Sequence, residues 1–269
     1  MQILRCLMTA MILSIGFSST DVLAEEQSPP PFDHEHAAWT AVLEKAVYVI
    51  GPVSKVDYAG LKSDPAPLDR YLALLSKVTQ KEFDGFLKNE QIAFLINAYN
   101  AFTLKLIRDG YDENLRSIRD LGGFISSPWK KSFFSLLGEE RNLDWIEHDT
   151  LRRKYGDNRV HFALNCASVG CPRLWNKAWR PQKLEELFED ACRAFLSDAN
   201  RNRYDKASKT IYISKMFDWY KEDFGGNNAG IRSFVSKYMT RDPKIAEEIR
   251  MPVTKIEFLE YDWNLNAKK

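Results

Sequence analysis

The segment from Glu90 to Arg108 reads EQIAFLINAYNAFTLKLIR and has the strongest helical pattern of the sequence. Apolar residues recur in it every three or four positions, as on one face of an α-helix, and Gly110 follows as a stop signal. The neighbouring face is also apolar and carries Ala93, Ala101 and Leu104. A helix that is apolar over most of its circumference lies in the interior of a domain. The sequence therefore predicts a long central helix over 90–108.

Two amides interrupt the apolar surface of this helix. Asn97 and Asn100 lie three residues apart on its second face. A buried amide that lacks a hydrogen-bond partner costs ~1–3 kcal/mol. Each asparagine therefore either bonds to neighbouring backbone and holds a loop, or orients a histidine or contacts a ligand. The second interpretation makes both of them supporting residues of a catalytic site.

Shorter patterned segments surround the predicted central helix. Helices are expected over 36–47, 67–78, 144–153 (capped by Asp144), 181–197, 216–222 and 229–238. Extended segments are expected over 55–58, 132–136, 142–143, 210–214 and 255–261. Helices and strands do not alternate regularly, which argues against a doubly wound sheet. The predicted fold is α+β and helix-dominant, with several helices packed around the long helix and a small antiparallel sheet.

The N-terminus has the features of a cleavable signal peptide. One basic residue, Arg5, precedes an apolar run from Cys6 to Phe17, and Val22-Leu23-Ala24 suits signal peptidase. The apolar run is shorter than the ~20 helical residues that a permanent membrane anchor needs. We therefore expect a signal peptide over 1–24, a periplasmic or secreted protein, and no stable membrane insertion.

The mature chain is expected to form one domain after a short extension. Pro29-Pro30-Pro31 predicts a flexible, proline-rich extension over 25–35, followed by a single globular domain over 36–269. His34 and His36 lie beside the proline stretch and are expected at the surface. The sequence has 38 Lys and Arg against 37 Asp and Glu, a net charge of +1. Basic and acidic residues are balanced and interspersed, without a basic surface that would attract nucleic acid, so no nucleic acid is expected among the partners.

Most of the candidate chemistry lies in residues 160–172, which read VHFALNCASVGCP. His161 and Cys166 are about 140° apart around a helix, and on opposite faces of a strand. The two side chains can therefore meet only if the chain turns between them. Cys192 instead lies on the apolar stripe of the 181–197 helix and is expected to be buried.

The preferred interpretation is a thiol-dependent hydrolase or acyl transferase with Cys166 as nucleophile. A histidine would favour the thiolate, as in other cysteine enzymes. His148, next to Glu147 on a different predicted helix, is the better base, and His161 is a second acid–base or orienting residue. The supporting amides would be Asn97, Asn100 or Asn165. The substrate would be a small molecule or a peptide, and no cofactor is expected.

Two other interpretations use the same residues. Cys166 and Cys171 can form a structural disulfide around Gly170, with His161 in the core, in a noncatalytic domain that binds a cell-envelope protein. Alternatively, His148, His161 and the two cysteines bind zinc in a zinc-stabilised fold. The spacing of five residues is wider than that of common zinc motifs, so this third signal is weak.

Five stretches carry a resemblance to a known family, namely Phe94–Ala101, Ile146–His148, Arg159–Pro172, Phe217–Phe224 and Tyr261–Asn266. On them the chain resembles the domain of unknown function 547 family (DUF547), found in exported bacterial proteins and, fused to a leucine zipper, in plants. The resemblance implies one domain over about 35–266 and implies no particular reaction. A papain- or transglutaminase-like arrangement, with cysteine and histidine facing each other across a cleft, is suggested by analogy.

The aromatic and acidic residues of the last two stretches also have a purely structural interpretation. Large aromatic rings bury ~150–250 Å² each, so the core is the expected place for Trp219, Tyr220, Phe224 and Trp263. Caps or ion pairs are expected for Asp218, Asp223 and Asp262.

Overall fold

The computed structural model describes residues 31–123 and 127–268. The predicted signal peptide over 1–24 and residues 25–30 of the expected extension lie outside the described residues. A compact unit begins at Phe32. The Phe32 ring packs edge-on against Phe94, with ring centroids 5.2 Å apart. This contact makes residues 32–35 part of the unit.

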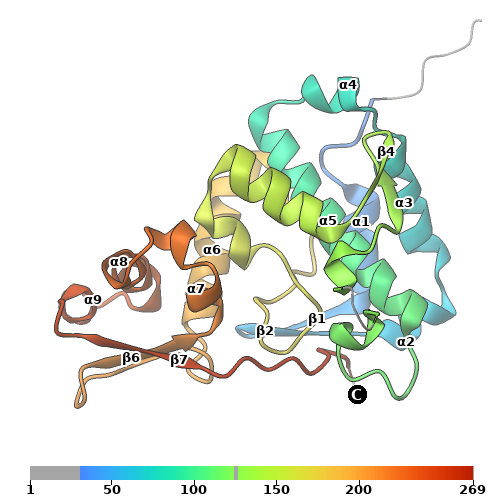
Figure 1. Ribbon diagram of the computed structural model, residues 1–269. Coiled ribbons are helices and arrows are strands. Elements are labelled where there is room, and N and C mark those ends of the chain that lie inside the picture. Colours follow the sequence, from blue (N-terminus) through green and yellow to red (C-terminus); the bar gives the residue numbers. More distant parts are fainter. Residues whose placement is uncertain (1–30, 124–126, 269) are drawn as a thin grey trace, which may run out of the picture. The chain divides into compact units, whose positions relative to one another are not determined.

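The predicted central helix is confirmed as α5 (Lys88–Gly110). The carboxylate of Glu90 accepts a hydrogen bond from the backbone N–H of Leu87 at 2.7 Å, which caps the first turn. Every side chain from Ile92 to Leu104 is buried. The elements packed against α5 include α2 (Tyr58–Ser63), α3 (Ala66–Lys77) and η3 (Trp145–Tyr155) (Figure 1).

Most other predicted helices are present within two residues of their expected ends. They are α1 (Ala37–Ala46), η5 with α6 (Pro181–Lys183, Leu184–Leu196), α7 with η6 (Met216–Trp219, Lys221–Phe224) and α8 (Asn228–Met239). The helices not expected from the sequence are α4 (Gln80–Asp84), η1 (Ile118–Leu121), η2 (Pro128–Lys130), η4 (Asn158–Phe162) and α9 (Pro243–Arg250), besides α2. None of the helices in the described ranges is long and apolar enough to cross a bilayer.

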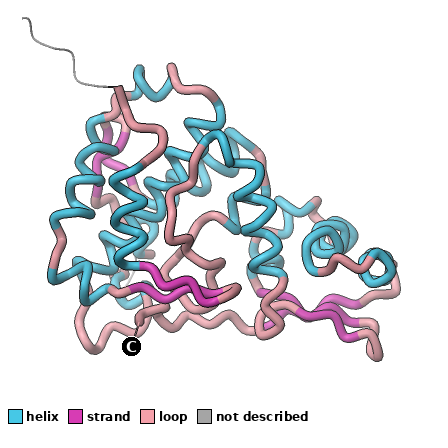
Figure 2. Tube along the Cα trace, turned by 180° about the vertical axis from the view of Figure 1, so that it is seen from behind, coloured by secondary structure: helices cyan, strands magenta, loops and turns pink. Residues whose placement is uncertain are grey.

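The strands form three small sheets, visible in Figure 2. Two are antiparallel hairpins, β1 (Val47–Ile50) with β2 (Val53–Val56) and β3 (Phe134–Leu136) with β4 (Glu139–Arg141). The third has the order β5 (Arg203–Asp205), β6 (Thr210–Ser214), β7 (Lys255–Leu259). Its β6 and β7 are parallel, unlike the expected antiparallel pairing, because α7, α8 and α9 lie between them as a crossover.

His36 is buried, which corrects the expectation that it lies at the surface. Its side chain hydrogen-bonds through Nδ1 to the hydroxyl of Tyr71 at 2.8 Å, and the residue is 1% exposed. The ring of Phe32 packs edge-on against it. Burial lowers the pKa of His36 to about 3, although nearby Asp33 opposes the shift. The surface position was expected because prolines precede His36 in the sequence, and that local pattern does not show that Phe32 packs over the His36 ring.

Candidate functional site

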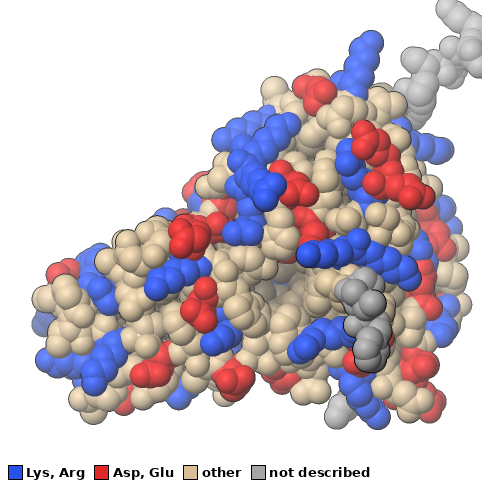
Figure 3. Space-filling view, in the orientation of Figure 1, with Lys and Arg blue, Asp and Glu red and all other residues tan. Residues whose placement is uncertain are grey.

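A cavity of about 410 Å³ opens where η3, the loop of residues 163–172, α7 and the C-terminal segment meet. Figure 3 shows a hollow on this face, with Lys and Arg side chains at its outer rim. Three of the five predicted catalytic residues, His148, His161 and Cys166, line the cavity. Asn97 and Asn100 are not among the described residues that line it. The turn required between His161 and Cys166 is therefore present, and both side chains reach one cavity.

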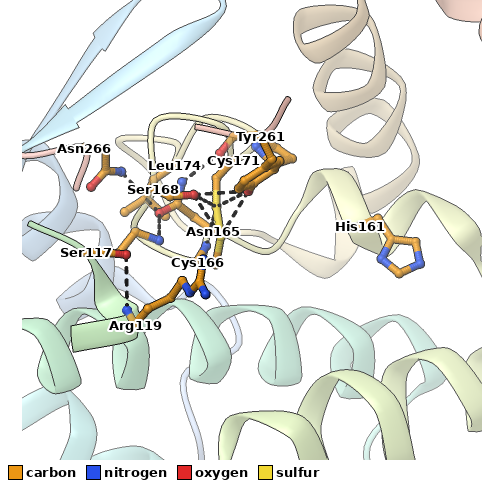
Figure 4. Close-up of a disulfide and its surroundings, with 12 residues drawn as sticks. Ser117, Arg119, His161, Asn165, Cys166, Ser168, Cys171, Leu174, Tyr261 and Asn266 are labelled. Carbon is orange, nitrogen blue, oxygen red and sulfur yellow. Dashed lines mark hydrogen bonds between the residues drawn. A yellow bond between two sulfur atoms is a disulfide. The ribbon is translucent and has the colours of Figure 1, made fainter. Parts of the chain in front are cut away.

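The two cysteines of the 163–172 loop are joined by a disulfide between Cys166 and Cys171. Cys171 is 3% exposed, whereas Cys166 is only half-buried. Figure 4 shows the disulfide next to Tyr261 and Ser168, with His161 apart from it and no hydrogen bond joining the ring to either sulfur. The disulfide of the second interpretation is thus formed, and in this state position 166 carries no thiol.

Tyr261 and Ser168 form a short chain of hydrogen bonds to the disulfide. The Ser168 hydroxyl donates to the oxygen of Tyr261 at 3.1 Å, and the Tyr261 hydroxyl donates to Sγ of Cys171 at 3.2 Å. The backbone N–H of Cys166 donates to the same sulfur at 2.9 Å. Burial raises the pKa of Tyr261 well above its usual range, so its hydroxyl remains a donor at neutral pH. The Tyr261 hydroxyl and the Cys166 N–H therefore converge on Sγ of Cys171.

The disulfide loop is held by the C-terminal segment. The backbone N–H groups of Val169 and Gly170 each donate at 2.8 Å, to the carbonyls of Asn264 and Asp262. Gly170 is required for this approach, because a Cβ there would come within 2.9 Å of the Tyr261 ring. The loop conformation therefore depends on a segment about ninety residues further along the chain.

The predicted amides hold backbone rather than facing the cavity. Asn97 both donates to the carbonyl of Trp179 at 2.8 Å and accepts from its N–H at 3.0 Å. Asn100 donates to the carbonyl of Ala163 and accepts from the N–H of Asn165, both at 2.9 Å. Asn165 continues the network across the loop, where it donates to the carbonyl of Pro172 at 2.7 Å. The central helix thus positions the segment that carries Cys166.

His161 is buried beside a half-buried ion pair between Arg152 and Asp223. Its Nε2 lies 2.6 Å from Oδ2 of Asp223, and its ring stacks on Tyr220 with centroids 4.0 Å apart. Two N–H groups of Arg152 donate to the same carboxylate at 2.6 and 2.9 Å. Burial acts to raise the pKa of Asp223, but hydrogen bonds from His161 and Arg152 outweigh it and hold that pKa well below its usual range. The imidazole of His161 is therefore committed to a carboxylate and not to Cys166.

His148 and the carboxylates of Asp144 and Glu147 lie at one end of η3, which is a π-helix. π-Helical turns are rare overall, but those that occur are often found at functional sites. A guanidinium can only donate, so Nδ1 of His148 accepts the hydrogen bond from Arg152 at 2.9 Å. When the ring is neutral, its proton is therefore on Nε2. That nitrogen lies 3.7 Å from Oδ1 of Asp144. Burial, partly opposed by His148, raises the pKa of Asp144.

Comparison with protein families identifies part of the chain. The model of the family described as "Protein of unknown function, DUF547" matches residues 83–196. The chain contains a DUF547 domain. The DUF547 match includes α5, η3 and the disulfide loop, and it ends before Tyr220 and Tyr261 on the other wall of the cavity. Comparisons with curated proteins and with solved structures find no match.

An aromatic wall beyond the DUF547 match is the part of the site that sequence reasoning missed. Trp219, expected in the core, is 45% exposed and lines the cavity. Its ring stacks on that of Trp263 with centroids 5.6 Å apart, and its centroid lies 4.9 Å from that of Tyr261. The signal was present in the sequence, because Phe217-Asp218-Trp219 and Tyr261-Asp262-Trp263 share one aromatic-Asp-Trp pattern. Only the tertiary structure shows that the two copies meet at a cavity.

Two further expectations change with the structure. Asp144, expected to cap its helix, makes no capping hydrogen bond and instead lines the cavity. The zinc interpretation requires two thiolates, whereas the sulfurs of Cys166 and Cys171 are bonded to each other. Within the described ranges no group of three or more His, Cys, Asp or Glu side chains is arranged to hold a metal ion. Cys192 is buried and free, as its place on the apolar stripe predicts.

Proposed function

We propose that this chain is an exported binding domain of the cell envelope whose cavity takes an organic cation, such as an amine or the basic side chain of a peptide. The observation that carries the proposal is the composition of the cavity wall. Asp144 and Glu147 supply carboxylates, and six Trp and Tyr rings surround them. None of the described residues that line the cavity is Lys or Arg. Aromatic faces and carboxylates together are the surfaces that bind organic cations.

The aromatic rings around the cavity already bind guanidinium groups of the chain itself. The guanidinium of Arg119 lies over the Trp263 ring, 5.3 Å from its centroid. That of Arg152 lies over the Tyr220 ring at 4.8 Å. A half-exposed Trp219 on the same wall offers a further ring to a ligand, and an exposed aromatic patch in a cavity is typical of a binding site. The ring faces around the cavity are therefore able to bind a cation.

Nucleophilic catalysis has less support from this geometry. A thiol-dependent hydrolase or acyl transferase needs the Cys166 thiolate beside an imidazole. Here Cys166 is oxidised, its sulfur contacts the hydroxyls of Ser168 and Tyr261 at 3.3 Å, and His161 is paired with Asp223. The catalytic roles predicted for Cys166, His148, His161, Asn97 and Asn100 would require reduction of the disulfide and a different partner for the imidazole. The binding proposal needs neither change.

Titration with a cation and its neutral isostere tests the proposal. Choline and 3,3-dimethylbutan-1-ol have the same shape and differ in charge, and binding of either can be followed through Trp fluorescence. We expect choline to bind at least about tenfold more tightly, because only the cation gains from the carboxylates and the ring faces. Equal affinity of the two probes, or binding of neither, would contradict the proposal.

A matched pair of variants locates the site. Asp144→Asn removes a carboxylate of the cavity and should weaken choline binding by about tenfold, or ~1.4 kcal/mol. Asp149→Asn removes an exposed carboxylate that lies further along the same helix and pairs with Arg153, and it should leave the affinity unchanged. Similar losses in both variants would mean that long-range charge, and not the cavity, attracts the probe.

Export is tested separately from binding. The proposal includes removal of residues 1–24, after which the mature chain starts at Glu25. Mass spectrometry of the protein from a periplasmic or culture-medium fraction should give that N-terminus. Recovery of the full-length chain with Met1 intact from the cytoplasm would rule out export.

A further inference from the structure

The Cys166–Cys171 disulfide lies in the wall of a cavity and not inside the core. Both cysteines line the cavity that we propose to bind organic cations. Their burial differs, since Cys166 is half-buried and Cys171 is 3% exposed. Of the two residues, Cys166 is therefore the one that an incoming reactant meets more easily. Access to one sulfur of a disulfide is the first requirement of thiol–disulfide exchange.

The buried sulfur has the surroundings of a leaving group. Sγ of Cys171 accepts from the backbone N–H of Cys166 at 2.9 Å and from the Tyr261 hydroxyl at 3.2 Å. Hydrogen-bond donors aimed at a sulfur stabilise its thiolate. The Ser168 hydroxyl donates to the Tyr261 oxygen, which leaves the Tyr261 proton for a sulfur. Both hydroxyls also lie 3.3 Å from Sγ of Cys166, so among these contacts only the Cys166 N–H is particular to Cys171. A negative charge that develops on Cys171 would therefore meet one donor of its own and a hydroxyl donor that it shares with Cys166.

The loop is also held by hydrogen bonds that do not involve the disulfide. The C-terminal segment holds the backbone of Val169 and Gly170 from one side, and Asn100 holds that of Ala163 and Asn165 from the other. The disulfide closes a loop between residues only five apart, and such a short loop gains less stability from a cross-link than a long one. These contacts would keep the two sulfurs close together in the reduced protein as well. A cross-link that closes only a short loop, at a place open to reactants, suggests a chemical role.

We propose that the Cys166–Cys171 pair exchanges disulfides with thiol-bearing peptides that enter the cavity. A substrate thiolate attacks Sγ of Cys166, a new sulfur–sulfur bond forms, and the Cys166–Cys171 bond breaks with its electron pair going to Cys171. A second thiolate of the peptide then attacks the substrate sulfur of this mixed disulfide and releases Cys166 as a thiolate. The peptide loses two electrons and two protons and becomes a disulfide, and the protein becomes a dithiol. Exchange with a small-molecule disulfide, such as oxidised glutathione, returns the protein to its starting state.

The first experiment compares the two cysteines as single thiols. In full mature protein, Cys171→Ala leaves Cys166 and Cys166→Ala leaves Cys171, and both variants are mixed with oxidised glutathione. We expect Cys171→Ala to form its mixed disulfide at least about tenfold faster, because Cys166 is the accessible sulfur. Cys192 is buried, and burial raises the pKa of its thiol, so Cys192→Ala in both backgrounds should change neither rate. Equal rates for the two cysteines, or faster reaction of Cys171, would overturn the proposed order of attack.

The second experiment uses the wild-type protein and so does not depend on the folding of a variant. A synthetic peptide with two cysteines is incubated with oxidised glutathione with and without the protein, and its oxidation is followed by mass spectrometry. We expect the protein to accelerate oxidation at least about tenfold, and Tyr261→Phe to reduce that acceleration while circular dichroism stays unchanged. A disulfide that stays intact in excess reduced glutathione, with no acceleration, would make it a structural cross-link. Choline binding would be unaffected by that outcome, so the two proposals fail separately.

Discussion

The hydroxyl of Tyr261 donates to Sγ of Cys171 across 3.2 Å, and the two residues lie 90 positions apart in the sequence. This contact connects the C-terminal segment to the disulfide loop. The segment also accepts hydrogen bonds from the loop backbone through Asp262 and Asn264. One wall of the cavity thus depends on residues outside the part of the chain that matches the DUF547 family.

Gly170→Ala should loosen this connection. The added Cβ would lie 2.9 Å from the Tyr261 ring and 3.0 Å from the carbonyl oxygen of Asp262, so the C-terminal segment must shift. We expect the free energy of unfolding to fall by about 1–3 kcal/mol, measured by urea denaturation. Gly85→Ala is the control, because its Cβ would come no closer than 3.3 Å to another atom and its φ is −80°. Equal effects of the two substitutions would show that the contact with Tyr261 is unimportant.

Asn100→Ala should destabilise the fold by about 2–4 kcal/mol in urea denaturation. The substitution leaves the carbonyl of Ala163 and the N–H of Asn165 buried without the amide that now bonds both. Asn100→Asp keeps the acceptor for Asn165 but places a buried carboxylate oxygen against the carbonyl of Ala163, so it should not restore the wild-type stability. Asn89→Ala, at an exposed position in the first turn of the same helix, serves as control. A loss below about 0.5 kcal/mol for Asn100→Ala would contradict the positioning role.

The stability of the protein should fall as the pH is lowered from about 6.5 to about 3, because of His36. Burial lowers the pKa of His36 to about 3 in the folded state, whereas the ordinary pKa of an exposed histidine is 6.5. In this pH window the unfolded chain binds a proton that the folded state does not, so protonation favours unfolding. The slope approaches about 1.4 kcal/mol per pH unit. Urea denaturation at several pH values should show this slope in the wild type and a flatter profile in His36→Gln; identical profiles would disprove the assignment.

Asp223→Asn should cost about 2–3 kcal/mol of stability, because the amide cannot replace the charge-assisted bonds to His161 and Arg152. The lowered pKa of Asp223 adds a pH signature. The contribution of Asp223 to stability is present above the unfolded-state pKa of ~3.9 and is lost as the pH falls below that value. Below that pH, Asp223→Asn should therefore lose less stability than the wild type. Asp218→Asn removes a more exposed carboxylate paired with Lys215 and should cost under about 1 kcal/mol. Equal costs for the two variants, measured by urea denaturation, would argue against a stabilising role of the bonds from His161 and Arg152 to Asp223.

The sequence predicted those helices and strands whose pattern of apolar residues lies within a single segment. The run from Glu90 to Arg108 predicted a long buried helix, because apolar spacing and burial are both properties of that segment alone. The geometry of helices and strands also showed that the chain must turn between His161 and Cys166 if they share a site. Both residues do line one cavity, but Asn165, between them, turns inward and bonds to Pro172.

Sequence patterns alone predicted the helix-dominant α+β fold, the central position of α5 and the concentration of histidine and cysteine near residues 160–172. The groups that meet are known only from the packing of the elements: Cys166 with Cys171, His161 with Asp223, and Trp219 with Trp263. Helical spacing is a local property that a few neighbouring residues already express. The partner of a side chain from a distant segment depends on how separate elements pack, and one sequence carries no local pattern for that.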